Sequence, residues 1–350
     1  MPVIKPIIHL CIPQLLQPLA LWKRDFLFEP EAPELASLLS QFERQESGSI
    51  QGADASLFHA VGIINNTELP VAGYRFQAHF KKEPKQFLIC ADPIHLVVGM
   101  NDITLTKKID DLSDDEAQEL IDDLNQHFKQ DGLVFSKGSN CHWYLALAEK
   151  EAIKTTPLDE VIRKNIKDYL PHSESRNWNV LQNEAQMILH ASAVNQQREM
   201  AGLPTVNSLW FWGGGGVEVI ASEQKNVACI YHNDSYEAEI KARTAAKVVN
   251  CETQKLAEDG SDLPSLINRE QGKSIILLDQ LFQAAIHDNL DLYQQALAKL
   301  DTQIIKPLSH AWKVRKIEII IDGCDGKILK PIKPSVWKFW KNKPCSLADI

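Results

Sequence analysis

Apolar residues along the chain follow two spacings, each of which recurs several times. Short apolar runs of strand length predict β-strands, at residues 3–12, 86–91, 133–136, 143–147, 206–212, 227–231, 274–278 and 317–321. Apolar positions three and four residues apart predict helices, at residues 32–42, 53–61, 113–130, 175–200, 236–248 and 290–312, and Thr156-Pro157 begins another. Strands that alternate with helices are typical of α/β proteins with a mainly parallel sheet flanked by helices, so we expect this fold class.

Two local motifs mark helix ends. Ser113-Asp-Asp-Glu116 is a capping box, in which two side chains satisfy the first backbone N–H groups of a helix. Gly202-Leu-Pro204 has the glycine and following proline that commonly end a helix. The expected helix at 175–200 therefore turns sharply into the strand at 206–212.

The chain shows no internal repeat and no low-complexity linker. We therefore expect a single α/β unit over residues 1–350, with a smaller inserted or capping subdomain at about residues 100–180. The strands at 3–12, 206–212, 274–278 and 317–321 should pair in one mainly parallel sheet, with helices on both faces.

Composition narrows the classes of partner. The chain has 37 lysines and arginines against 46 aspartates and glutamates, a formal net charge of -9, which disfavours general nucleic-acid binding. Its seven cysteines include no CxxC pair, so we expect reduced thiols in a cytoplasmic protein rather than a zinc knuckle or a disulfide framework. No apolar run approaches the ~20 residues that span a bilayer, so we expect no membrane segment.

Several polar residues stand where ligands commonly bind. Asp92 and His95 lie in an expected loop at 91–96, directly after a strand, and are either ligands or a capping aspartate and a buried histidine. Asn195 and Arg198 share a helix face, where Arg198 binds either a carboxylate or phosphate, or a surface acid. The glycine run 213–216 follows a strand and is either an anion cradle or a mobile turn.

The C-terminal segment 327–343 carries six lysines and no acid, together with Trp337, Phe339 and Trp340. This composition suits nucleic acid or another anionic surface. Docking of the aromatic side chains on the core is the simpler interpretation, and we favour it.

The order of these segments resembles a known bacterial family. The stretch LQNEAQMILHASAVNQQREMAGLPTVNSLWFWGGGG at 181–216, with ADPIHL at 91–96, LNQHF at 124–128, PLDEVI at 157–162 and WKFWKNKPCSL at 337–347, resembles the RpfE-type regulatory proteins, also described as predicted phosphoglycerate mutases. The resemblance covers most of the chain.

A more distant resemblance is to the archaeal-type cofactor-independent phosphoglycerate mutases of the alkaline phosphatase superfamily. Their DPH loop, N..R helix and strand ending W.WG.G are similar, in the same order, to segments of this chain. The resemblance implies an alkaline-phosphatase-like α/β core around a metal site, with an inserted substrate domain. It also implies a ligand site, built here from Asp92, His95, Asn195, Arg198, Asn207, Trp212, Gly213, Gly214 and Gly215.

The catalytic residues of that family are where this chain departs from it. The chemistry needs a serine or threonine nucleophile and two divalent ions. The resemblance places Ala53 at the nucleophile position, and places Ile12-Pro13 and Gln283 where metal-ligating acids stand in the family. Asp54, His287 and Asp322 remain as metal candidates, too few for two hard ions, which need several anionic oxygens and imidazoles.

We therefore expect a non-catalytic, regulatory or ligand-binding protein without a cofactor. Its ligand would be a small anionic metabolite, bound outside the carboxyl ends of the parallel strands, where Arg198 and the glycine run would converge. One alternative is an active phosphomutase that uses manganese or magnesium at a divergent site formed by Asp54, Asp92, His95, His287 and Asp322. A second alternative is an interaction protein without a small ligand; the protein partner is left open.

Overall fold

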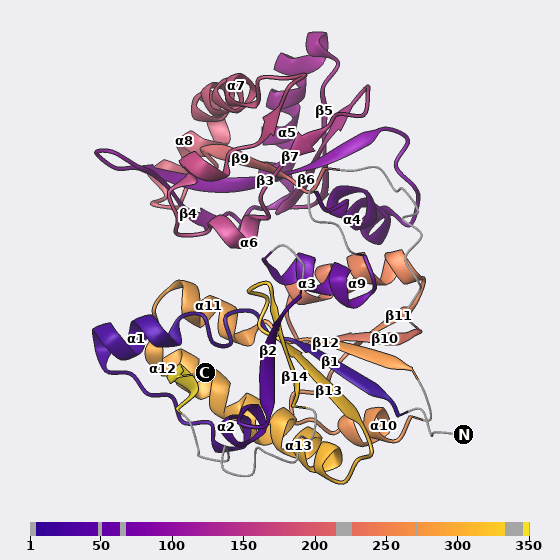
Figure 1. The fold of residues 1–350 in the computed structure, drawn as a ribbon. Coiled ribbons are helices and arrows are strands. Elements are labelled where there is room, and N and C mark those ends of the chain that lie inside the picture. Colours follow the sequence, from indigo (N-terminus) through magenta and orange to yellow (C-terminus); the bar gives the residue numbers. More distant parts are fainter. Residues whose placement is uncertain are drawn as a thin grey trace. The chain divides into compact units, whose positions relative to one another are not determined.

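The computed structural model describes residues 5–47, 51–63, 68–214, 226–269, 272–332 and 346–349. The chain forms two compact units, drawn in Figure 1. Unit 1 comprises Met1–Asn66 and Ala221–Ile350, and unit 2 comprises Thr67–Ile220. The segment inserted into unit 1 is therefore longer at both ends than the expected 100–180.

Unit 1 is built on a seven-stranded sheet of order β11-β10-β12-β1-β13-β14-β2. Its strands are β1 (Ile7–Cys11), β2 (Phe42–Glu46), β10 (Val227–His232), β11 (Glu252–Lys255), β12 (Lys273–Leu277), β13 (Glu318–Asp322) and β14 (Lys327–Pro331). The five strands from β11 to β13 are parallel, and β14 and β2 extend the sheet in antiparallel pairing. The expected fold class, a mainly parallel sheet flanked by helices, is confirmed.

Alternating side chains of β1 point to opposite faces of this sheet, as the pleat requires. Ile8 and Leu10 pack in the core on one face, and Cys11 packs in the core on the other. The first face is covered by α1 (Leu19–Phe26), α2 (Pro33–Leu39), α10 (Leu263–Ile267), α11 (Gln280–Ile286), α12 (Leu290–Lys299) and α13 (Lys306–Lys313). The second is covered by α3 (Ala53–Ala60) and α9 (Tyr236–Val249).

The helix expected at 290–312 forms, but its middle is widened. Residues Leu300–Ile305 form a π-helical segment between α12 and α13. Pro307 accounts for the widening, because it has no N–H to donate to the carbonyl of Gln303 and its ring would clash there in a regular helix. Within this segment Asp301 accepts hydrogen bonds from the backbone N–H groups of Glu34 and Leu35, and so caps α2 from outside that helix.

Unit 2 contains an antiparallel sheet centred on β3. Its strands are β3 (Phe87–Val98), β4 (Ile103–Lys108), β5 (Val134–Ser139), β6 (His142–Leu147) and β9 (Ser208–Trp212), and the short strands β7 (Ile153–Lys154) and β8 (His172–Ser173) pair separately. Helices α5 (Asp114–Phe128) and α7 (Trp178–Ala191) pack in the core on one face. Helix α4 (Val71–Phe80) packs against Tyr144 and Asp92 on the other, and α6 (Leu158–Val161) and α8 (Ala193–Met200) complete the unit. The capping box at Ser113 is confirmed at the start of α5.

Three sequence predictions are wrong. The strand predicted at 206–212 forms as β9 but pairs with β3 in unit 2, because an apolar run carries no information about its partner strand. The expected loop 91–96 is part of β3. The helix predicted at 175–200 is broken at Ser192, whose backbone is extended (ψ 139°).

Two further expectations lie beyond what the structure covers. Gly215 and most of the basic aromatic segment, residues 333–345, are outside the described residues. Among the helices that the structure describes, none is long and apolar enough to cross a membrane.

Candidate functional site

The expected nucleophile position lies at the carboxyl end of the parallel sheet. Gly52, with φ 107°, donates its backbone N–H to the carbonyl of Cys324 at 2.9 Å, which joins the start of α3 to the turn after β13. The positive φ favours glycine here. Ala53 follows as the first residue of α3, is 2% exposed and packs in an apolar cluster with Cys11 and Leu277. Ala53 therefore offers only a buried methyl group.

The three candidate metal ligands of unit 1 do not come together. The Asp54 carboxylate lies 3.9 Å from the Nζ of Lys241. The Oδ1 of Asp322 accepts hydrogen bonds from Ser56 Oγ at 2.9 Å and from the backbone N–H of Cys324 at 2.8 Å. His287 is an exposed residue at the end of α11. Among the described residues, this set does not fit two hard divalent ions, which need several oxygen and imidazole donors around each ion.

A different group of donors lies beside Asp322. His9 and Cys11 share one face of β1, and their side chains together with Asp322 offer donor atoms within 4.8 Å of one another. Burial, together with the nearby charge of Lys273, lowers the pKa of His9 to about 4, so the imidazole is neutral at neutral pH. Burial raises the pKa of the Cys11 thiol. Sequence analysis missed this group, although a histidine and a cysteine two residues apart in an apolar strand were its signal.

In unit 2, Asp92 is fully buried, and its carboxylate accepts hydrogen bonds from several groups of the protein. Its two oxygens accept from Arg75 Nη1 and Nη2, each at 2.8 Å, in a bidentate pair. They also accept from Trp212 Nε1 at 2.8 Å and from the backbone N–H of Trp143 at 3.2 Å. Burial alone would raise the pKa of Asp92, but the Arg75 guanidinium outweighs it and holds that pKa below its usual range. The pair of Arg75 and Asp92 therefore links α4 to strand β3 of the antiparallel sheet.

Three more predicted ligands bind the backbone beside β9. His95 Nδ1 lies 2.8 Å from the carbonyl oxygen of Thr205. The Asn207 side chain accepts from the N–H of Leu96 and donates to its carbonyl, as a paired strand would. Asn195 does the same with Val206, and also donates to the carbonyl of Leu189 at the break between α7 and α8.

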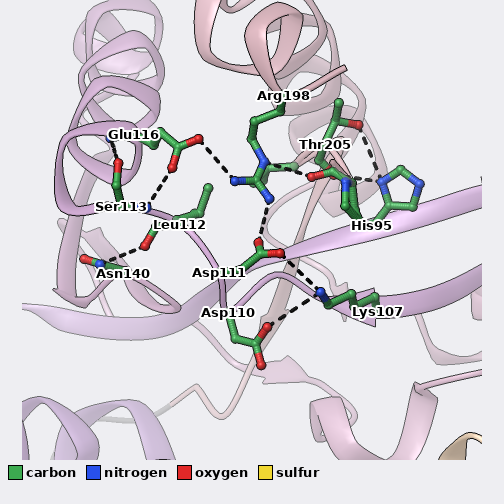
Figure 2. Close-up of polar contacts among 12 residues, drawn as sticks. His95, Lys107, Asp110, Asp111, Leu112, Ser113, Glu116, Asn140, Arg198 and Thr205 are labelled. Carbon is green, nitrogen blue, oxygen red and sulfur yellow. Dashed lines mark hydrogen bonds and ion pairs between the residues drawn. The ribbon is translucent and has the colours of Figure 1, made fainter. Parts of the chain in front are cut away.

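Arg198 is 2% exposed and faces α5 (Figure 2). Its Nη2 donates to Asp111 Oδ1 at 2.5 Å, its Nη1 to Glu116 Oε1 at 3.1 Å, and its Nε to the carbonyl of Pro204 at 2.9 Å. The interpretation of Arg198 as a partner of protein acids is thus the one that the structure favours.

In the described part of the glycine run, Gly213 and Gly214 bind side chains of the protein itself. Gly214 donates its N–H to Glu68 Oε1 at 2.9 Å, and Gly213 donates to Thr155 Oγ1 at 2.9 Å. Glu68 also accepts from the N–H and hydroxyl of Thr155. Burial raises the pKa of Glu68 to about 7, although these hydrogen bonds favour its charged form.

Arg198 and the described glycines Gly213 and Gly214 are engaged with different groups of the protein. The donors of Arg198 are taken by Asp111 and Glu116, and those of Gly213 and Gly214 by Thr155 and Glu68. The sequence could not reveal this, because each partner is far from its acceptor or donor along the chain.

Unit 1 contains a cavity of about 320 Å³ that sequence analysis did not locate. It opens beyond the carboxyl ends of β10 and β12, where the chain leaves β10 toward β11 on one side and leaves β12 toward β13 on the other. In open α/β sheets, ligands bind where neighbouring connections diverge in this way. Its apolar wall consists of Leu256, Leu278, Leu292, Ala296, Leu300 and Ile304. Its charged side chains are Glu258, Lys299 and Asp234, which pairs with Lys255 at 2.7 Å, and its other polar side chains are Asn233, Gln280, Gln295 and Gln303.

Comparison with known proteins supports the family resemblance in one segment. Residues 93–195 match the model of the 2,3-bisphosphoglycerate-independent phosphoglycerate mutase family. This segment lies in unit 2 and includes neither Ala53 nor Asp322. No curated protein matches the chain.

Two solved structures resemble this fold over nearly its whole length. The PH0037 protein from Pyrococcus horikoshii is 13% identical, with 94% of this chain and 88% of that chain covered and a TM-score of 0.52. The cofactor-independent phosphoglycerate mutase from Thermoplasma acidophilum DSM 1728 is 15% identical, with 93% and 89% covered and a TM-score of 0.45. At 13% identity, the likeness to the Pyrococcus protein establishes the fold alone.

The buried pair of Arg75 and Asp92 predicts a large effect on stability. Replacing Asp92 by asparagine leaves the Arg75 guanidinium buried without its counter-charge, which should lower the free energy of unfolding by about 3–5 kcal/mol. Urea denaturation measures this. Asp110→Asn is the matched control, because Asp110 lies 3.8 Å from Lys107 in an exposed pair worth at most about 1 kcal/mol. Equal stabilities of the two variants would contradict the structural role of Asp92.

Glu68 predicts a dependence of stability on pH. Its pKa is about 7 when folded and near 4.5 when unfolded, so between these values the folded chain binds the extra proton and the free energy of unfolding falls as pH rises. Relative to Glu68→Gln, the native chain should lose up to about 3 kcal/mol between pH 4.5 and pH 8. Chemical denaturation across this range is the measurement, with the exposed Glu83→Gln as control. Parallel profiles for native chain and Glu68→Gln would refute it.

Proposed function

We propose that this chain is a phosphoglycerate-mutase-like protein that does not transfer phosphate and instead binds a small organic anion in unit 1. The observation that carries the first part is Ala53, which stands buried at the nucleophile position implied by the resemblance. A methyl group has no lone pair with which to attack phosphorus. Asp54 and His287 support the same conclusion, since neither belongs to a group of three metal-donor side chains within 4.8 Å of one another among the described residues.

The cavity of unit 1 supports a binding function. Its volume of about 320 Å³ lies within the range of small-molecule sites, and its wall combines an apolar surface with a few polar groups. Lys299, which forms no ion pair with any residue the structure describes, supplies a cation at one end. The π-helical turn contributes Leu300, Gln303 and Ile304 to the wall, and such turns are frequent at functional sites.

The chemistry of this wall selects the class of ligand. An anionic head group would pair with Lys299, and an apolar body would replace water against Leu278, Ala296 and Ile304. A compact sugar phosphate, polar on all sides, would leave that surface uncovered. A protein that responds to such a ligand would fit the regulatory role implied by the resemblance to the RpfE-type family.

The missing nucleophile predicts that the purified chain does not interconvert phosphoglycerates, with or without added manganese or magnesium. Ala53→Ser should also be inactive, because a serine hydroxyl needs metal ions to lower its pKa. A coupled mutase assay on both proteins is the measurement. Turnover that rises with added metal and persists after repurification would overturn the proposal and favour an active enzyme with a divergent metal site.

The cavity predicts binding of small acids with an apolar body. We expect hexanoate and hexyl phosphate, tested by calorimetry on the full chain, to bind more tightly than 3-phosphoglycerate. Ala296→Trp should abolish binding by filling the cavity. Lys299→Met should weaken it up to about fivefold, because an exposed ion pair contributes at most about 1 kcal/mol.

Lys313→Met is the matched control, since Lys313 is exposed on α13 and does not line this cavity. If no acid binds, or if Ala296→Trp binds as well as the native chain, the ligand proposal fails. The interaction protein without a small ligand would then take its place.

A further inference from the structure

Three side chains on the α3 and α9 side of the parallel sheet offer an unexplained set of donors. His9, Cys11 and Asp322 are 2%, 0% and 1% exposed. Cys11 lies directly opposite Asp322 in the pairing of β1 with β13, and His9 lies two residues before Cys11 on the same face. One donor atom from each residue lies within 4.8 Å of the other two, and His9 Nε2 is 3.7 Å from Asp322 Oδ2.

The polar atoms at the centre of this group have no hydrogen-bond partner among the described residues. Both ring nitrogens of His9 and the Oδ2 of Asp322 are buried and unsatisfied. A buried polar atom without a partner costs about 1–3 kcal/mol, so three of them in one place require an explanation. A cation placed between them would satisfy His9 and Asp322 together.

We infer that His9, Cys11 and Asp322 form a buried binding site for one transition-metal ion, with Zn²⁺ as the ion that fits the donors best. Imidazole nitrogen, thiolate sulfur and carboxylate oxygen are the three donors that zinc accepts, whereas manganese and magnesium prefer oxygen. Donors bound at roughly 2.0–2.3 Å around a tetrahedral ion lie roughly 3.3–3.8 Å apart. The 3.7 Å between His9 and Asp322 already falls in this range.

The surroundings of Asp322 have the form of a second coordination shell. Its Oδ1 is held by Ser56 Oγ and by the backbone N–H of Cys324, which leaves Oδ2 directed at His9. Outer hydrogen bonds of this kind orient carboxylate ligands at metal sites. This site shares Asp322 with the metal candidates implied by the resemblance, but it differs from that two-ion site because its other two donors, His9 and Cys11, lie within β1 itself.

Charge balance also suits one divalent ion. The nearest buried cation is Lys273, whose Nζ donates to the carbonyl of Ala60 at 2.7 Å and acts electrostatically on both His9 and Cys11. Zinc binding converts the Cys11 thiol to a thiolate and releases its proton to solvent. The ion, the thiolate and the carboxylate then sum to zero, so Lys273 faces a neutral centre.

The experiment measures metal in the purified chain of 350 residues. The chain is produced with zinc in the medium, purified, and analysed by mass spectrometry; a second sample is unfolded with a chelator and refolded with Co²⁺. We expect about one zinc per chain, and a near-ultraviolet charge-transfer band from a cobalt–thiolate bond. Cys11→Ala should remove that band and reduce bound metal at least about tenfold.

Two further variants separate the site from general effects on folding. Cys229→Ala alters another buried cysteine of the same sheet, outside the cluster, and should keep both the zinc and the band. Ser56→Ala leaves all three ligands in place and should weaken zinc binding by about 10–100-fold.

The inference is overturned if the native chain holds no zinc and gives no cobalt–thiolate band after refolding. It is also overturned if a folded Cys11→Ala retains the metal. The zinc content and the cobalt spectrum of the native chain are decisive on their own. The inference can therefore be tested even if a variant fails to fold. The result is independent of the proposed anion cavity, which none of these residues lines.

Discussion

Unit 1 depends on the central position of its first strand. β1 pairs with β12 on one side and with β13 on the other, so it is completed only by strands from the C-terminal part of the chain. Its side chains from Ile8 to Cys11 are buried, whichever face they point to. A polar residue at any of these positions is therefore shielded from water, as His9 is, with 2% of its surface exposed. The chain leaves this sheet after β2 and α3 and returns to it at β10, and unit 2 is formed by the segment between them.

How much the sequence could predict depended on whether a signal was local. The capping box at Ser113 and the apolar runs that became β12 and β13 involve neighbours in sequence, and their elements were predicted correctly. The pairing of β9 with β3 was not, because the run Ser208–Trp212 is equally apolar whichever sheet it joins. Asp92 was assigned to a loop for a related reason: its partner Arg75 lies on α4, a helix that the sequence analysis did not predict.

Three buried polar side chains help to hold unit 2 together. Asp92, Asn195 and Arg198 each bind protein groups. These contacts join α4, α5, α8 and the ends of β3 and β9, and add to the apolar core that α5, α8, β3 and β9 already share. Burial makes each contact costly to break, since a partner left alone in the interior keeps its desolvation penalty. The hydrogen bonds and ion pairs of these three side chains therefore contribute to the stability of unit 2.

The π-helical segment Leu300–Ile305 also affects how the sequence of the surrounding helix should be aligned with other chains. Its apolar positions Leu300, Ile304, Leu308 and Trp312 are spaced by four residues, whereas each residue of an α-helix turns by ~100°. Over three such steps a regular helix would drift by ~120° away from the core. The π-helical turn takes up about one residue of this drift and keeps Leu308 buried. A chain one residue shorter here would present the same face to the core, so residue-by-residue matching through a regular helix would rotate α13 by ~100° and misassign part of its buried face.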